Sequence, residues 1–139
     1  MAPPGIMVLS VFFTFFAAVI GRMVKADFNH QQVLKICNGQ QNFDVDFGIC
    51  RGTLLFKIEE EAMSAELHDV YEKGCQDNSD ARVFAHAVCT ETLPDNDCFN
   101  CLRSASDQLI EECTNNVGGQ MTLMDCHVRF EQYHFNNDV

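Results

Sequence analysis

Eight cysteines are the residues of this 139-residue chain with the most evident chemistry, and five of them form the series C-x8-C-x2-C-x11-C-x12-C that begins at Cys89. Thiols at such spacings bind zinc, form redox pairs or close structural disulfides. A zinc site at Cys98 and Cys101 would need a second C-x-x-C or a histidine pair at ligand spacing, and His127 and His134 do not supply one. A thioredoxin-type redox pair would need a βαβ context, in which a helix joins two parallel strands, and the sequence does not show one. We therefore predict structural disulfides, no metal and no cofactor.

The N-terminal segment determines the expected redox environment of these thiols. Residues 6–20 form an apolar run whose length suits the central region of a secretory signal peptide and is short for a membrane span. We predict a signal peptide over residues 1–26 and one exported domain over residues 27–139, with no membrane span. An uncleaved membrane anchor is the alternative, because the basic Arg22 and Lys25 are atypical near a cleavage site. In an oxidising compartment the eight cysteines, which all lie in the exported domain, permit four disulfides.

The net charge disfavours two classes of function. The whole chain has 9 basic and 20 acidic residues and a formal charge of −11. Without Arg22 and Lys25 the exported domain keeps 7 basic residues against the same 20 acidic ones, which gives −13. A field of this sign repels phosphate backbones and anionic lipids. We therefore expect neither nucleic-acid binding nor cationic membrane lysis, whereas neutral polar ligands such as sugars remain compatible with the composition.

Hydrophobic periodicity predicts two helices and four strands. Apolar residues at helical spacing indicate helices over residues 45–62 and 95–113, and Asp95 is expected to be the N-cap of the second. The cysteines of the second helix lie on its apolar stripe, where they can fasten it to the layer beneath. Residues 63–80 are polar and without periodicity, which is typical of a surface loop. Strands are expected over residues 27–37, 82–90, 120–125 and 127–135.

Several polar residues are candidates for chemistry outside the cysteine frame. The acidic run 59–61 is interpreted as a solvated helix face, and the lone His86 as a packed or hydrogen-bonded strand residue. In the last strand Arg129, Glu131 and Tyr133 share one face, where a carboxylate between a guanidinium and a phenol can accept hydrogen bonds from sugar hydroxyls. The alternative is an ordinary polar sheet face with an ion pair. No arrangement of nucleophile, base and acid is evident, so we do not expect an enzyme.

Five motifs, spread over the exported domain, give the chain its most specific signal. They are Cys-Asn at 37–38, Ala-x-Cys at 87–89, Asp-Cys-x-x-Cys-Leu at 97–102, Cys-x-Asn-Asn-x-x-Gly at 113–119 and Asp-Cys-x-x-x-x-Glu-Gln at 125–132. Together with the cysteine spacing they resemble the ginkbilobin-type domain. This plant cysteine-rich secreted module also occurs, usually in tandem, outside cysteine-rich receptor-like kinases and plasmodesmata-located proteins. The single domain and the closing Phe-Glu-Gln-Tyr-His-Phe are similar to the antifungal members of the family.

The resemblance implies a fold and a set of disulfides. The fold class is α+β, with two helices packed on an antiparallel sheet of about five strands. The bridges implied are Cys37–Cys113, Cys89–Cys98 and Cys101–Cys126. The two remaining cysteines depart from the family's six-cysteine frame, and because they are left over as a pair in an exported chain, we predict a fourth bridge, Cys50–Cys75. The link that closes the longest loop, Cys37–Cys113, should stabilise the domain by roughly 4 kcal/mol on the chain-entropy model.

The resemblance also implies a sugar site. It points to a non-enzymatic plant defence protein of the apoplast that binds mannose or mannan of the fungal cell wall and inhibits fungal growth. The asparagine and glutamate of the family's site fall on Asn38 and Glu131, and its arginine falls on Gln120. Loss of a charge-assisted hydrogen bond at Gln120 would cost about 1.5–3 kcal/mol, or about ten- to hundredfold in affinity. The alternative is an extracellular protein-interaction or signalling module that has lost the sugar site and whose acidic surface suits a basic partner.

Overall fold

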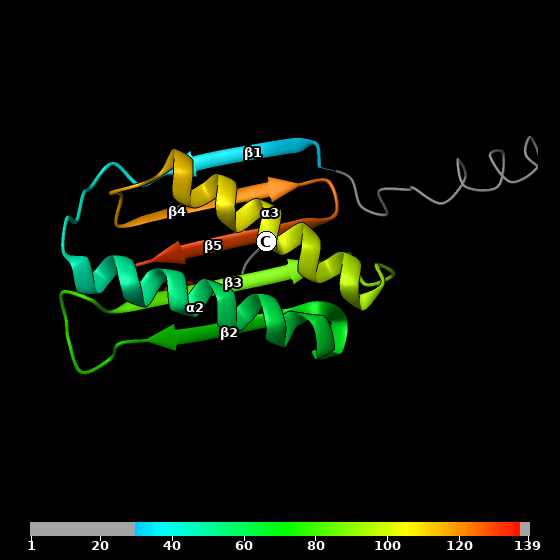
Figure 1. Cartoon of the computed structure of the whole chain (residues 1–139), viewed down its shortest axis with the longest axis horizontal. Helices are drawn as coiled ribbons and strands as arrows, with labels where there is room; N and C mark the ends of the chain where they lie inside the picture. Colours follow the sequence, from blue (N-terminus) through cyan, green and yellow to red (C-terminus); the bar gives the residue numbers. More distant parts are fainter. Residues whose placement is uncertain (1–29, 137–139) are drawn as a thin grey trace, which may run out of the picture.

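The computed structural model describes residues 30–136, so the expected signal peptide at 1–26 lies outside the described residues. Two helices lie side by side on one face of a five-stranded antiparallel sheet with the strand order β1-β4-β5-β3-β2 (Figure 1). This arrangement confirms the predicted α+β fold. The elements in chain order are β1 (Gln32–Cys37), α2 (Val45–Ser64), a 3-10 helix (Glu66–His68), β2 (Asp69–Gly74), β3 (Val83–Cys89), α3 (Asp95–Glu112), β4 (Gly118–Leu123) and β5 (Cys126–Glu131).

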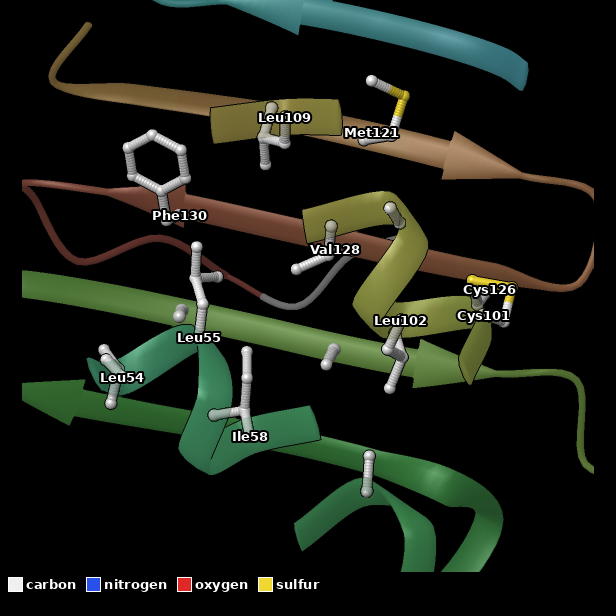
Figure 2. Close-up of a cluster of buried hydrophobic side chains, with 14 of the residues drawn as sticks. Leu54, Leu55, Ile58, Cys101, Leu102, Leu109, Met121, Cys126, Val128 and Phe130 are labelled. Carbon is white, nitrogen blue, oxygen red and sulfur yellow. A yellow bond between two sulfur atoms is a disulfide. The ribbon is translucent and has the colours of Figure 1, made fainter. Parts of the chain in front are cut away.

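The hydrophobic core lies between the two helices and the sheet (Figure 2). Both helices present an apolar stripe at i, i+3 and i+4 spacing, and β3, β4 and β5 present alternate residues to it. This periodicity is the reason why the sequence predicted both helices and β3 correctly. The largest fully buried apolar side chains are Phe47, Leu55, Ile58, Leu102, Leu109, Met121, Leu123, Val83, Val128 and Phe130.

The two helices begin in different ways. Asp44 is the N-cap of α2, and its Oδ1 accepts a hydrogen bond from the backbone N–H of Asp46 at 2.8 Å. The predicted N-cap of α3, Asp95, is wrong: Pro94 holds that place without a side-chain cap, and Asp95 is the first helical residue. Pro94 has extended backbone angles, and its carbonyl accepts from the N–H of Cys98 at 2.9 Å. Neither helix within residues 30–136 is long and apolar enough to cross a membrane.

The predicted surface loop over residues 63–80 is wrong in its central part, which forms the 3-10 helix and the edge strand β2. β2 pairs along its whole length with β3, from Asp69 opposite Val88 to Gly74 opposite Val83. In the described part of the chain, β2 has one neighbouring strand, and it carries charged residues on both faces, so it has no alternation of apolar and polar residues. β2 therefore forms because it pairs with β3, and its local sequence has no pattern from which the strand could be predicted.

The acidic run 59–61 is only partly the solvated face that was expected. Glu60 is exposed, but Glu59 is fully buried between α2 and α3. Its Oε2 lies 3.4 Å from Nη1 of Arg103 on α3, and burial raises the pKa of the Glu59 carboxyl. Glu59 thus belongs to the contact between the two helices.

Four disulfides fasten the helices to the sheet, in the four pairs that were expected. One joins the end of β1 to the end of α3, one joins α2 to the loop after β2, and two join α3 to β3 and β5. Figure 2 shows the last of these beside the core. The pairs are Cys37–Cys113, Cys50–Cys75, Cys89–Cys98 and Cys101–Cys126.

Candidate functional site

The sheet face opposite to the helices carries the polar residues of β4 and β5. Residues that lie directly opposite in an antiparallel pair point to the same face. Met121 lies opposite Val128, and both are buried against the helices. Alternation therefore places Gln120, opposite Arg129, on the other face, and Glu131 shares that face with Arg129.

The carboxylate of Glu131 is the centre of a hydrogen-bonded network on this face. Its Oε1 accepts from Nε and Nη2 of Arg129, both at 3.2 Å, and its Oε2 accepts from Nδ2 of Asn38 at 3.3 Å. Glu131 is only 5% exposed, so these partners replace most of the water that a free carboxylate would bind. The structure thus brings together Asn38 and Glu131, which lie 93 positions apart in the sequence.

Asn38 is held in place by its backbone. Its N–H donates to the carbonyl of Gly118 at 2.8 Å, and its own carbonyl accepts from Nδ2 of Asn116 at 2.6 Å. Its side-chain Oδ1 accepts from the N–H of Gln40 at 3.0 Å, which closes a turn of the Asx type. With Oδ1 engaged in the turn, the amide nitrogen is the group that points to Glu131.

Gly118 provides the space in which the carboxylate lies. It sits opposite Glu131 in the β4–β5 pair, and a Cβ atom at this position would be 1.7 Å from Oε2 of Glu131. A side chain at residue 118 would therefore occupy the place of the carboxylate oxygen. Sequence reasoning missed this role, because the pattern around Gly118 indicates a turn and only the strand register reveals the contact.

Arg129 lies between the carboxylate and an aromatic group contributed by the C-terminal segment. Its guanidinium stacks on the ring of Phe135 at 4.2 Å, and its Nη2 lies 3.4 Å from the hydroxyl of Tyr133. The sequence correctly placed Arg129, Glu131 and Tyr133 together, but the guanidinium, not the carboxylate, is the middle group. The reason is that β5 ends at Glu131, before the predicted end at residue 135, and the chain then folds back so that Phe135 packs on Tyr71 of β2.

Gln120 is beside this network. It is half-buried, lies opposite Ile36 on one side and Arg129 on the other, and shares their sheet face. The hydrogen bonds of Glu131 within residues 30–136 involve Asn38 and Arg129, and not Gln120. Of the three expected site residues, two are in direct contact and the third is a cross-strand neighbour of Arg129.

Two buried histidines extend the polar face away from the network. His86 on β3 has its Nε2 2.7 Å from Oδ1 of Asp69, which confirms its expected role as a hydrogen-bonded strand residue. His127 on β5 has its Nδ1 2.6 Å from the hydroxyl of Thr122. Burial, together with the nearby His86 and Arg129, lowers the pKa of His127 to about 4. The imidazole of His127 is therefore neutral at neutral and mildly acidic pH.

We predict that His127 makes the domain less stable in acid. Because the folded-state pKa lies below the unfolded value of 6.5, the contribution is complete above pH 6.5 and is lost as pH falls towards 4. The loss should be about 2 kcal/mol after allowance for solvent screening. Urea unfolding at pH 7 and pH 4 should show that the natural protein loses more stability than His127→Asn, whose amide can still reach Thr122. Equal losses in the two proteins would contradict the prediction.

The chemistry of the site is that of hydrogen-bonded recognition. A carboxylate, a guanidinium and an amide lie at one end of an open sheet face, next to aromatic rings, and each can exchange hydrogen bonds with hydroxyl groups. Within residues 30–136 no group of three or more histidine, cysteine, aspartate or glutamate side chains is placed to hold a metal ion.

The chain is similar to several plant proteins over part of their length. It is 32% identical over 50 residues to the antifungal protein ginkbilobin-like protein 1 of Picea sitchensis, which is 36% of this chain and 38% of that protein. It is 30% identical over 88 residues to the putative cysteine-rich repeat secretory protein 23 of Arabidopsis thaliana, 60% of this chain and 34% of that protein. The chain thus spans little more than a third of the length of these relatives.

Two solved structures share the fold. The tandem DUF26 ectodomain of the Arabidopsis thaliana cysteine-rich receptor-like protein PDLP8 superposes with a TM-score of 0.70 at 23% identity, over 78% of this chain and 51% of that one. The corresponding ectodomain of PDLP5 gives a TM-score of 0.67 at 16% identity, over 76% and 51%. Residues 34–133, the greater part of the chain, match the model of the salt stress response/antifungal family. The chain therefore belongs to the salt stress response/antifungal family, as the resemblance of its cysteine frame predicted.

Proposed function

We propose that this protein is a secreted, non-enzymatic plant defence protein of the apoplast, which binds mannose or mannan of the fungal cell wall and inhibits fungal growth. The observation that carries the proposal is the contact of Asn38 and Arg129 with the two oxygens of Glu131 on the open sheet face. The names of similar proteins, which include antifungal ginkbilobin-like proteins, support the same class of activity.

The three groups complement the hydroxyls of a sugar. A hydroxyl can donate to a carboxylate oxygen of Glu131 while it accepts from the amide of Asn38 or the guanidinium of Arg129. Because the three groups already hold one another in place, a ligand need not order them, and little conformational entropy is lost on binding. A neutral ligand also avoids the repulsion that the acidic domain exerts on anions.

Arg129 compensates for the missing arginine at position 120. It lies directly opposite Gln120 in the β4–β5 pair, and its two hydrogen bonds to Oε1 of Glu131 give the carboxylate a guanidinium partner from the neighbouring strand. Its side chain is 24% exposed, so part of it is accessible to a ligand. Gln120, half-buried on the same face, is placed to contact a second hydroxyl.

We predict that Glu131→Gln weakens mannose and mannan binding by about ten- to hundredfold, because a neutral amide loses charge-assisted hydrogen bonds worth about 1.5–3 kcal/mol. Calorimetric titration of the purified, fully oxidised protein measures this effect. Glu60→Gln is the matched control, since Glu60 is an exposed carboxylate on the helical layer. Arg129→Gln should weaken binding similarly. The natural protein, with glutamine at position 120, should bind the sugar without the Gln120→Arg change. Equal affinities of the natural protein and Glu131→Gln would place the sugar elsewhere.

A second candidate function is that of an extracellular protein-interaction or signalling module. The observation in its favour is that Glu131, at 5% exposure, already has hydrogen bonds at both oxygens, while position 120 lacks an arginine. The acidic surface of the domain would suit a basic protein partner. Sugar binding by Gln120→Arg but not by the natural sequence would favour this module. No binding by either protein would rule out the sugar site.

A further inference from the structure

β1 is an edge strand that leaves three apolar side chains exposed. Within residues 30–136 it pairs with β4 alone and is the outermost strand, at the edge of the sheet farthest from α2 (Figure 1). Val33, Leu34 and Ile36 are 57%, 41% and 47% exposed. Leu34 and Ile36 lie opposite Thr122 and Gln120 on the open sheet face, whereas Val33 lies at the irregularity where the register of β1 shifts between Gln32 and Leu34. The outer edge of β1 therefore combines backbone hydrogen-bonding groups with unburied apolar surface.

The opposite edge of the sheet is protected against pairing. β2 carries charged residues along its length, including Asp69, Glu72 and Lys73, and Glu72 is bound to Lys57 of α2 at 3.1 Å. Charges on an edge strand oppose the docking of another strand, because they would have to lose water. β1 has a single charged residue, Lys35, which is already paired with Glu112 of α3. The two edges thus differ in the way expected if one of them is used as an interface.

We propose that the outer edge of β1 is a dimer interface, where two copies of this chain pair their β1 strands antiparallel about a two-fold axis. The axis is perpendicular to the sheet, so the two sheets become continuous and both pairs of helices lie on the same side. In the register that centres on Lys35, Leu34 of each copy lies opposite Ile36 of the other, and the exposed apolar side chains on the open face cover one another. The two Lys35 residues then lie opposite each other on the helical side, where each is neutralised by Glu112 of its own copy.

Charge favours a second copy at this edge. The chain carries a formal charge of −11, so most of its surface repels another copy. β1 contains no acidic residue, and its one base and the paired Glu112 make the edge locally neutral. Two such edges can therefore approach with little electrostatic cost, and the apolar burial and the new backbone hydrogen bonds provide the attraction.

A second exposed apolar cluster, formed by Phe43, Val45 and Ile49 at the start of α2, provides the comparison. It is interleaved with the exposed Asp44 and Asp46, so two acidic copies that met there would bring carboxylates of like charge together. The two clusters have the same number of exposed apolar residues and differ in their charges. We therefore expect self-association at β1 and not at the start of α2.

Sedimentation equilibrium of the purified, fully oxidised protein tests the proposal. The natural protein should pass from monomer to dimer as its concentration rises. Ile36→Lys should weaken the dimer at least about tenfold, because each interface contains the change twice and loses apolar contact. Ile49→Lys is the matched control, at an exposed isoleucine of α2, and should dimerise like the natural protein. Amide hydrogens of β1 that point away from β4 should exchange more slowly in the concentrated natural protein.

Three results would overturn the proposal. One is a natural protein that stays monomeric at the highest soluble concentration. Another is an Ile36→Lys variant that dimerises as tightly as the natural protein. The third is loss of the dimer in Ile49→Lys, which would assign the interface to the start of α2. Both substitutions are at exposed positions, so circular dichroism and the absence of free thiols can verify that each variant keeps its fold.

Discussion

Replacing Gly118 with alanine is expected to weaken the proposed sugar binding by about a hundredfold and to lower the free energy of unfolding by about 2 kcal/mol. The added methyl would lie 1.7 Å from Oε2 of Glu131 and 2.9 Å from the backbone carbonyl of Phe130. The carboxylate must move to make room, and the movement breaks its hydrogen bond to Asn38. The backbone carbonyl cannot rotate away in the same manner, so part of the strain remains in the β4–β5 pair. Calorimetric titration with mannan and urea unfolding measure the two effects.

Gly39→Ala is the matched control for this substitution. Gly39 follows Asn38 in the same segment, and no heavy atom lies within 4 Å of the position that its Cβ would take. The variant should therefore bind sugar and unfold like the natural protein. If Gly118→Ala kept both the affinity and the stability of the natural protein, the carboxylate would have another position available, and the network around Glu131 would not be fixed by the strand register.

Most elements that the sequence predicted have an apolar side in the core, and the exposed edge strand β1 is the exception. α2, α3 and β3 bury most of one face or both, so their periodicity was visible without the fold. β2 was missed because an edge strand with charged residues on both faces carries no such periodicity. Its existence depends on hydrogen bonds to β3, which are a property of the assembled sheet.

The site was predictable to the same partial degree. Asn38 and Glu131 were identified through the cysteine frame, and the two-residue spacing of Arg129 and Glu131 placed both side chains on one face. The register that sets Arg129 opposite Gln120 and Gly118 opposite Glu131 could not be predicted, because it depends on how β4 and β5 align. The same limit concealed the stacking of Phe135 on Arg129, which requires the chain to turn back after β5.

Removal of the disulfide Cys37–Cys113, by alanine at both positions, is expected to lower the free energy of unfolding by about 4 kcal/mol. The bond joins residues 76 positions apart, so it excludes many extended conformations of the unfolded chain. Cys89–Cys98 spans only 9 positions, and its removal should cost less, about 2.5 kcal/mol. Urea unfolding of the two double variants tests the order, and equal losses would show that strain or packing, not loop length, determines the contribution.

The same disulfide should also affect the proposed sugar site, and in this it should differ from Cys50–Cys75. Cys37 ends β1 and directly precedes Asn38, so its bond to the end of α3 holds the amide of Asn38 against Glu131. Without the bond, Asn38 keeps its backbone contacts with β4, but β1 loses its covalent tie to the helical layer. We expect mannan affinity to fall by about tenfold, whereas the variant that lacks Cys50–Cys75 should bind like the natural protein. Unchanged affinity in both would mean that the backbone hydrogen bonds of Asn38 are sufficient to place its side chain, and that the disulfide contributes to stability alone.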